Sequence, residues 1–197
     1  GHIPVNATES LAAVGIVTTF LSMLIWVLGQ SRSAISSIIS QYLGANKLED
    51  VKNLPAQAIA IILGICLLVC LSTYPFATSI FKLYKASGLL LEYSVSYYKI
   101  RVIGLPFTLY TFAVFGIFRG LQNTYYPMLI AITGAVVNIL LDVLLVYGVA
   151  DVFSPLYLKG AAIASVLAQL LMAALATYFL LKKTQIPLKL TRPVNKE

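Results

Sequence analysis

The sequence has few of the residues from which enzymes and metal centres are built. Only 11% of its 197 residues are charged, His2 is the single histidine, and Cys66 and Cys70 are the only cysteines. The two cysteines lie four apart in an apolar stretch, which favours packing over a metal pair or a disulfide. The chain has no G-x-x-x-x-G-K-[ST] nucleotide loop and no nucleophile elbow. We therefore predict that it is not an enzyme, carries no cofactor and does not pump by hydrolysing ATP.

Apolar residues make up most of the chain. They account for 59% of the sequence and give a mean hydropathy of +0.89, well above the values of soluble domains. A helix needs about 20 mostly apolar residues to cross a hydrocarbon core roughly 30 Å thick. Five such stretches predict an all-α polytopic membrane protein of about five transmembrane helices, surrounded by membrane lipid. The predicted spans are residues 11–43, 54–76, 92–118, 127–149 and 158–181.

The net charge of +7 does not indicate nucleic-acid binding, because the basic residues are spread over short connectors and the tail. Short cytoplasmic loops of membrane proteins are enriched in Lys and Arg. Eight basic residues fall on one side of the predicted spans, and five fall on the other: Lys82, Lys85, Lys99, Arg101 and Lys159. This asymmetry predicts that residues 182–197 form a cytoplasmic tail or interlobe linker. We expect a multi-pass protein of the plasma membrane, in bacteria the inner membrane.

Asp142 is the one carboxylate well inside a predicted span. An acid inside the membrane costs several kcal/mol unless it faces a cavity or a partner, so we predict a functional role, with a structural hydrogen-bonding aspartate as the alternative. It follows Pro127 by about 15 residues, or roughly 23 Å of helical rise, which places it in the outer half of the membrane. Asn138 lies one turn earlier on the same face, where its amide either helps ligate a hard cation or bonds a neighbouring helix.

Two further residues inside predicted spans are candidates for function. Pro106 lies in the middle of the third span, where it removes a backbone donor and is expected to kink the helix. Arg32 lies near the cytoplasmic end of the first span. It is expected either to extend its charge to the interface or to contact a substrate or an ion-pair partner.

Residues 120–148 resemble the connector and fifth helix of the multidrug and toxic compound extrusion (MATE) family. In that family a G-x-x-[DN]-T-x-x-P motif precedes an N-x-x-x-D motif, and the matching residues here are Gly120, Asn123, Thr124, Pro127, Asn138 and Asp142. Other segments resemble the family in the same order: LAAVG at 11–15, SQYLGAN at 40–46, YYKIRVIGLPF at 97–107 and KGAAIAS at 159–165.

The resemblance implies that the chain corresponds to helices two to six of a twelve-helix, two-lobed transporter. In the family, an aspartate on the first helix joins the counterparts of Asn138 and Asp142 in binding Na⁺ or H⁺, and in some members a hydroxyl residue on the sixth helix takes part. Ser165 aligns with that hydroxyl residue. The first helix and the carboxy-terminal lobe are then the missing partners, and a possible Na⁺ at Asp142 and Asn138 is the only metal ion implied.

The leading functional hypothesis is cation-coupled antiport, driven by H⁺ or Na⁺, of amphiphilic and often cationic drugs or toxic compounds out of the cell. One alternative is a flippase of lipid-linked precursors in the same superfamily, which usually lines its cavity with several basic residues. A second alternative is a membrane scaffold subunit without a transport cycle, in which Asp142 only bonds a neighbouring helix. The sequence leaves the substrate and the coupling ion open.

Overall fold

The structure is a computed structural model that describes residues 7–51, 53–148 and 154–184. These residues form α-helices and two short 3₁₀ helices, with no strand among them. The helices are α1 (Ala7–Gly29), α2 (Ser31–Gly44), η1 (Leu48–Val51), α3 (Leu54–Thr73), α4 (Ala77–Leu83), α5 (Gly88–Arg101), η2 (Val102–Gly104), α6 (Leu105–Gly120), α7 (Tyr125–Tyr147) and α8 (Tyr157–Lys183). The prediction of an all-α chain is confirmed.

Five stretches of the described chain are long and apolar enough to cross a membrane. They are Thr8–Gly44, Leu54–Thr73, Gly88–Gly120, Tyr125–Tyr147 and Tyr157–Lys183. The predicted number of spans is therefore confirmed. The predicted tail at residues 182–197 lies outside the described residues from position 185 onward.

The first and third spans each consist of two helices. In the first span, α1 ends at Gly29 and α2 begins at Ser31, whose hydroxyl donates to the carbonyl of Leu28 at 2.7 Å. In the third span, the 3₁₀ turn η2 separates α5 from α6. Pro106 follows directly in the first turn of α6, and because its ring has no N–H and would crowd the carbonyl four residues earlier, the α-helical hydrogen bonding stops there.

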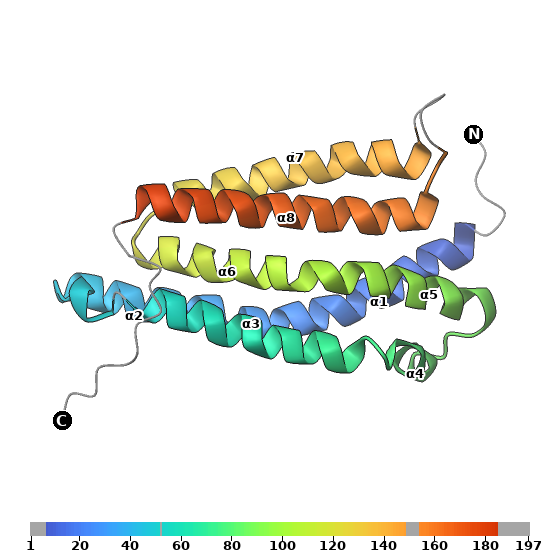
Figure 1. Cartoon of the computed structure of the whole chain (residues 1–197), viewed down its shortest axis with the longest axis horizontal. Coiled ribbons are helices and arrows are strands. Elements are labelled where there is room, and N and C mark those ends of the chain that lie inside the picture. Colours follow the sequence, from blue (N-terminus) through green and yellow to red (C-terminus); the bar gives the residue numbers. More distant parts are fainter. Residues whose placement is uncertain (1–6, 52, 149–153, 185–197) are drawn as a thin grey trace.

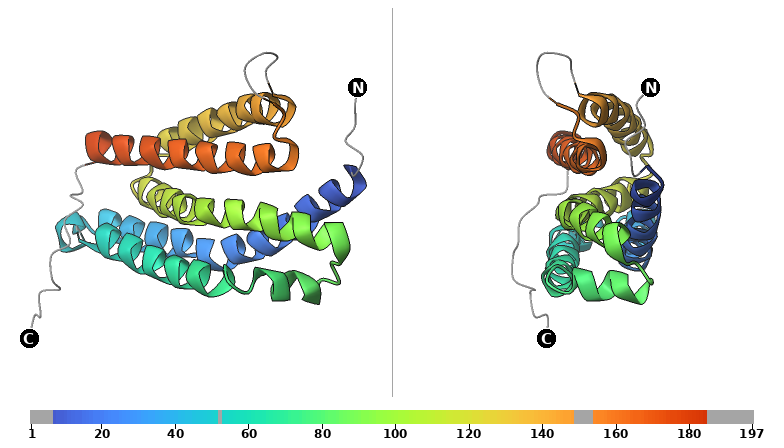
Figure 2. Two further views of the ribbon diagram at one scale, coloured as in Figure 1. Left: turned by 45° about the vertical axis from the view of Figure 1, so that its right-hand side comes forward. Right: turned by 90° about the vertical axis from the view of Figure 1, so that its right-hand side faces the viewer.

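Helix α6 lies at the centre of the bundle. Figures 1 and 2 show α7 and α8 side by side at one edge, α5 and α6 next to α8, and α2 and α3 at the opposite edge. Ten of the sixteen residues of α6 are buried. The main apolar core forms around this helix, with fully enclosed side chains such as Leu109, Val114 and Ile117.

A second apolar cluster joins the first half of α1 to α4 and α5. Phe20, Phe81 and Tyr98 pack edge to face, with ring centroids 5.4 to 6.0 Å apart. The buried Tyr98 hydroxyl donates to Thr73 Oγ1 at 2.6 Å. This cluster fixes α5 in the bundle and thereby sets the height at which its last turn meets α7 and α8.

Helix α7 has an apolar face that the described residues leave open. The side chains on that face include Val136, Ile139, Leu140 and Val143, which are 50 to 63% exposed. Lipid or other helices suit such a face, since it offers no polar group. The opposite face of α7 packs on α8, and the candidate site lies along that side.

Candidate functional site

Two close contacts set the register of the antiparallel pair α7 and α8. The side chain of Met172 occupies the space beside Gly134 that a Cβ would need, and the backbone of Leu145 lies against Gly160 in the same way. Interpolation between these two contacts places Asn138 level with Ala168 and Asp142 level with Ile163. Gln169 and Ser165 lie within two residues of those levels, so the two motif residues of α7 have two polar residues of α8 at similar heights.

Asp142 and Asn138 are both partly buried on α7. They are four residues apart, so they occupy neighbouring turns of one face. The Nδ2 atom of Asn138 is buried and has no hydrogen-bond partner in the described part of the chain. A buried polar group without a partner costs about 1–3 kcal/mol, so a group that contacts this amide during function would regain that energy.

The last turn of α5 brings a positive charge to the same place. Arg101 lies close enough to interact electrostatically with both Asp142 and Tyr97. Its Nε and Nη1 atoms are buried, and neither has a hydrogen-bond partner among the described residues. Tyr97, one turn before Arg101, is only 5% exposed. A permanently charged guanidinium and the carboxylate thus lie within electrostatic reach of each other, and both residues are partly buried.

Helix α8 adds an amide and a hydroxyl. The side chain of Gln169 lies in the space that a Cβ at Gly104 would occupy, so glycine at this position of η2 admits the amide. Gln169 Oε1 is buried and lacks a partner within the described ranges. The Ser165 hydroxyl donates to the carbonyl of Ala161 at 3.0 Å, which leaves the lone pairs of its oxygen available.

We call these side chains the α5–α7–α8 polar group: Tyr97, Arg101, Asn138, Asp142, Ser165 and Gln169. Its carboxylate, amide and hydroxyl oxygens are the ligand types that hard cations such as Na⁺ take. The described residues contain no cluster of three or more His, Cys, Asp or Glu side chains that would hold a transition metal. A carboxylate with neutral oxygens on neighbouring turns is chemically able to bind a proton or a hard cation.

The structure does not bring Arg32 to this group. Its guanidinium lies over the ring of Phe112 on α6, 4.8 Å from the ring centroid. Its backbone packs against Gly116 of the same helix. Arg32 thus belongs to the contact between α2 and α6. Pro106, the other candidate, lies closer to the polar group, because it follows η2, the turn whose Gly104 contacts Gln169.

Sequence reasoning missed Arg101, Gln169 and Tyr97. Arg101 was counted among the connector residues that set the orientation, but it lies inside the candidate span Gly88–Gly120. Its position nine residues into the predicted span 92–118 was a usable signal, because a charge inside a span is what singled out Asp142. Gln169 and Tyr97 gave no comparable signal, since their role depends on which helices α5 and α8 face.

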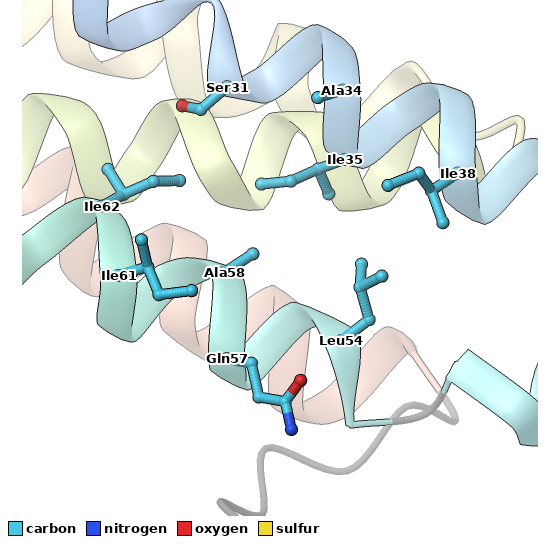
Figure 3. Close-up of a pocket in the computed structure, with 9 residues that line it drawn as sticks. All are labelled: Ser31, Ala34, Ile35, Ile38, Leu54, Gln57, Ala58, Ile61 and Ile62. Carbon is cyan, nitrogen blue, oxygen red and sulfur yellow. The ribbon is translucent and has the colours of Figure 1, made fainter. Parts of the chain in front are cut away.

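Two cavities lie away from the polar group. A cavity of about 380 Å³ borders Pro106 and Phe107 between α3, α6 and α8. Across it, the hydroxyls of Tyr110 and Thr177 share a hydrogen bond of 2.7 Å. The other cavity, of about 330 Å³, lies between α2 and α3; Figure 3 shows that Ile35 and Leu54 face it from either side. Both are mainly apolar, and no carboxylate of the described residues lines either of them.

Comparisons with known proteins agree with the resemblance seen in the sequence. The sequence profile of the MatE family matches residues 2–144. DNA damage-inducible protein F of Escherichia coli (strain K12) is 28% identical over 170 residues, which cover 86% of this chain and 35% of that protein. Protein DETOXIFICATION 43 of Arabidopsis thaliana is 33% identical over 102 residues, which cover 52% of this chain and 18% of that protein.

The fold is also similar to solved transporter structures. A crystal structure described as MATE in the bent conformation superposes with a TM-score of 0.86 at 25% identity, covering 95% of this chain and 42% of that one. The resemblance inferred from the motifs is thereby confirmed. The chain spans about two fifths or less of the length of these relatives.

Proposed function

Because this chain belongs to the MatE family, we propose that it is part of a cation-coupled antiporter that exports amphiphilic, often cationic drugs or toxic compounds. Membership places it among integral membrane transporters, in agreement with its five candidate spans. One observation carries the finer proposal: Asp142, a carboxylate inside a span, lies one turn from Asn138, whose amide nitrogen is buried without a partner in the described residues. We propose the plasma membrane, in bacteria the inner membrane, as its location.

The coupling chemistry follows from the carboxylate. An ionised Asp142 attracts Na⁺ or accepts a proton, and in both cases its negative charge is neutralised. For Na⁺, Asn138 and Ser165 supply neutral oxygens at neighbouring levels. Neutralisation weakens the attraction between Asp142 and Arg101, so it weakens the electrostatic link between α7 and α5.

We propose that the third span bends at η2 during this change, with Pro106 as the gating residue. The hydrogen bonding of the span is already interrupted there. The adjoining cavity, lined by Phe107 and Tyr110 among others, is mainly apolar with a hydroxyl pair, and such a lining suits an amphiphilic compound. The word detoxification in the name of the Arabidopsis relative supports toxic compounds as the substrate class.

The remaining parts of the transporter are proposed to complete the cycle. The chain covers 35% of the E. coli relative and 42% of the bent-conformation structure. From the family resemblance, we propose a first helix carrying a further acid and a carboxy-terminal lobe as the partners of this chain. Substrate export by alternating access requires both lobes, so every transport test below uses the full-length protein.

The experiment that tests this proposal is cation-driven dye efflux from proteoliposomes containing the full-length protein. Asp142→Asn is expected to abolish coupled efflux, at least a hundredfold in rate, because the amide neither binds H⁺ nor carries a charge for Na⁺. The matched control is Glu92→Gln, a carboxylate exposed near the start of α5, which should leave efflux unchanged. Efflux of the Asp142→Asn variant at the wild-type rate, with folding intact, would refute the role of this residue.

The two alternatives are less well supported by the geometry. A flippase would use basic residues inside the bundle. Here the charge of Arg101 is offset by Asp142, with which it interacts electrostatically. Arg32 packs on Phe112. If the chain were a membrane scaffold, the polar side chains near Asp142 should form hydrogen bonds to other helices. Asn138, Arg101 and Gln169 instead keep buried atoms without partners in the described structure.

A further inference from the structure

The residue that the proposed coupling mechanism leaves unexplained is Arg101. Its guanidinium stays charged in any protein environment, and a buried charge is costly unless another charge compensates it. Two of its nitrogens, Nε and Nη1, are buried with no hydrogen-bond partner in the described chain. The residue therefore needs a negative partner within the bundle.

Among the described residues, Asp142 is the carboxylate that meets this need. The remaining acidic residues of the described chain lie near helix ends or in connectors: Glu9, Glu49, Asp50 and Glu92. Arg101 lies within electrostatic reach of Asp142, and α5 packs on α8, the helix that pairs with α7. Tyr97, buried beside both charges, is the other titratable group that α5 presents here, and α8 contributes the neutral Ser165 and Gln169.

We propose that Arg101 is the internal counter-charge of Asp142, which the coupling cation displaces, so that Arg101 sets the cation concentration at which the transporter responds. When Asp142 is free of H⁺ or Na⁺, the guanidinium compensates its charge. When a cation neutralises Asp142, Arg101 loses its partner and turns to a neutral acceptor, for which Gln169 Oε1, buried without a partner in the described residues, is available. Arg101 is thus a positioning residue that competes with the cation for one carboxylate.

The proposal rests on the proposed function, since it assumes that Asp142 binds the coupling cation. Gly104 supports it independently. A side chain at position 104 would push out the Gln169 amide, so the fold keeps a neutral acceptor beside Gly104, the residue three positions after Arg101. An acceptor in this place serves a guanidinium that changes partners.

The test measures cation binding without requiring transport. Thermal unfolding of the purified full-length protein is followed while the concentration of Na⁺ or H⁺ is varied, because a ligand that binds the folded state raises the unfolding midpoint. Arg101→Gln removes the competing charge, so the half-saturating cation concentration should fall about tenfold, the effect of one nearby opposite charge on a carboxylate. Arg101→Lys keeps the charge and should stay close to wild type.

The matched control is Lys99→Gln, an exposed cation on the same helix whose ammonium lies over Tyr74; it should not move the half-saturation point. If Arg101→Gln binds the cation as the wild type does, the counter-charge role is overturned, while a loss of cation response in Asp142→Asn would still uphold the proposed function.

A double-mutant cycle separates the two proposals in the opposite case. If Asp142→Asn keeps its cation response, the coupling assignment fails, yet the charge pair can still be judged from stability alone. Combining Arg101→Gln with Asp142→Asn should then restore much of the unfolding midpoint lost in either single variant, because both charges are gone. Strictly additive losses would overturn the counter-charge proposal.

Discussion

Glycines allow close approach in two parts of this molecule, but different kinds of atoms approach them in each. Between α2 and α6, a Cβ at Gly116 would lie 2.5 Å from the backbone oxygen of Arg32, and one at Gly120 would lie 2.7 Å from the Cβ of Ile39. Next to the α5–α7–α8 polar group, Gly104 and Gly134 instead leave room for two side chains of α8, Gln169 and Met172. The first contact brings backbone onto backbone, whereas the second places flexible side chains against a helix.

The two contacts differ in how easily their side chains can rearrange. The contact of α2 with α6 is apolar around Ile39 and Ile117, which are fully buried, and such packing has one low-energy arrangement. The polar group leaves donors and an acceptor unpaired in the described residues, so more than one pairing is open to it. We infer that the first contact is a rigid support and that the second is the part of the bundle that changes with the cation.

The largest effect on stability is expected at Gly116. Gly116→Ala places a methyl group against the backbone of Arg32, which cannot turn away as a side chain can, so we expect a loss of about 3 kcal/mol in the free energy of unfolding. Denaturant or thermal unfolding in detergent measures it. Gly15→Ala is the control, because no atom lies within 4 Å of a Cβ there and alanine favours a helix by about 1 kcal/mol. Equal effects at both positions would contradict the rigid-support interpretation.

A smaller effect on stability but a clear effect on coupling is expected at Gly104. Gly104→Ala displaces the Gln169 side chain, which has other rotamers, so we expect a loss of about 1 kcal/mol. Cation-driven efflux should fall severalfold, because the neutral acceptor leaves the polar group. In Gly104→Ala combined with Gln169→Ala, stability should return while efflux stays low. Recovery of efflux in the double variant would show that Gln169 has no role in coupling.

The sequence was sufficient to predict the membrane-spanning helices and to select Asp142, but not to predict which side chains surround Asp142. Apolar stretches of about 20 residues identify spans directly, and an acid inside one of them is conspicuous. Register between α7 and α8 depends on the contacts at Gly134 and Gly160, which are tertiary and leave no local pattern. The break of the first span at Gln30 was also missed, since the hydropathy of residues 11–43 continues across it.

Arg101 and Arg32 also show that sequence alone does not reveal which intramembrane arginine lies near a carboxylate. Each is an arginine within a candidate span; for Arg32 the sequence left open an interfacial position or a contact with a substrate or ion-pair partner, and for Arg101 it raised no site role. In the structure, Arg32 lies over an aromatic ring, while Arg101 has buried nitrogens without partners. Which arginine meets a carboxylate is decided by helix packing, so a pattern of single residues could not separate them.

The smallest effect is therefore expected at Arg32. Arg32→Gln removes a cation–π contact with Phe112 on the partly exposed surface of α2, which is worth about 0.5–1 kcal/mol. The unfolding midpoint should drop slightly, and both efflux rate and half-saturating cation concentration should stay at wild-type values. Comparison with Arg101→Gln then sets two intramembrane arginines against each other. If Arg32→Gln abolishes efflux at unchanged stability, Arg32 contacts the substrate, and the contact of α2 with α6 is part of the transport pathway instead of its support.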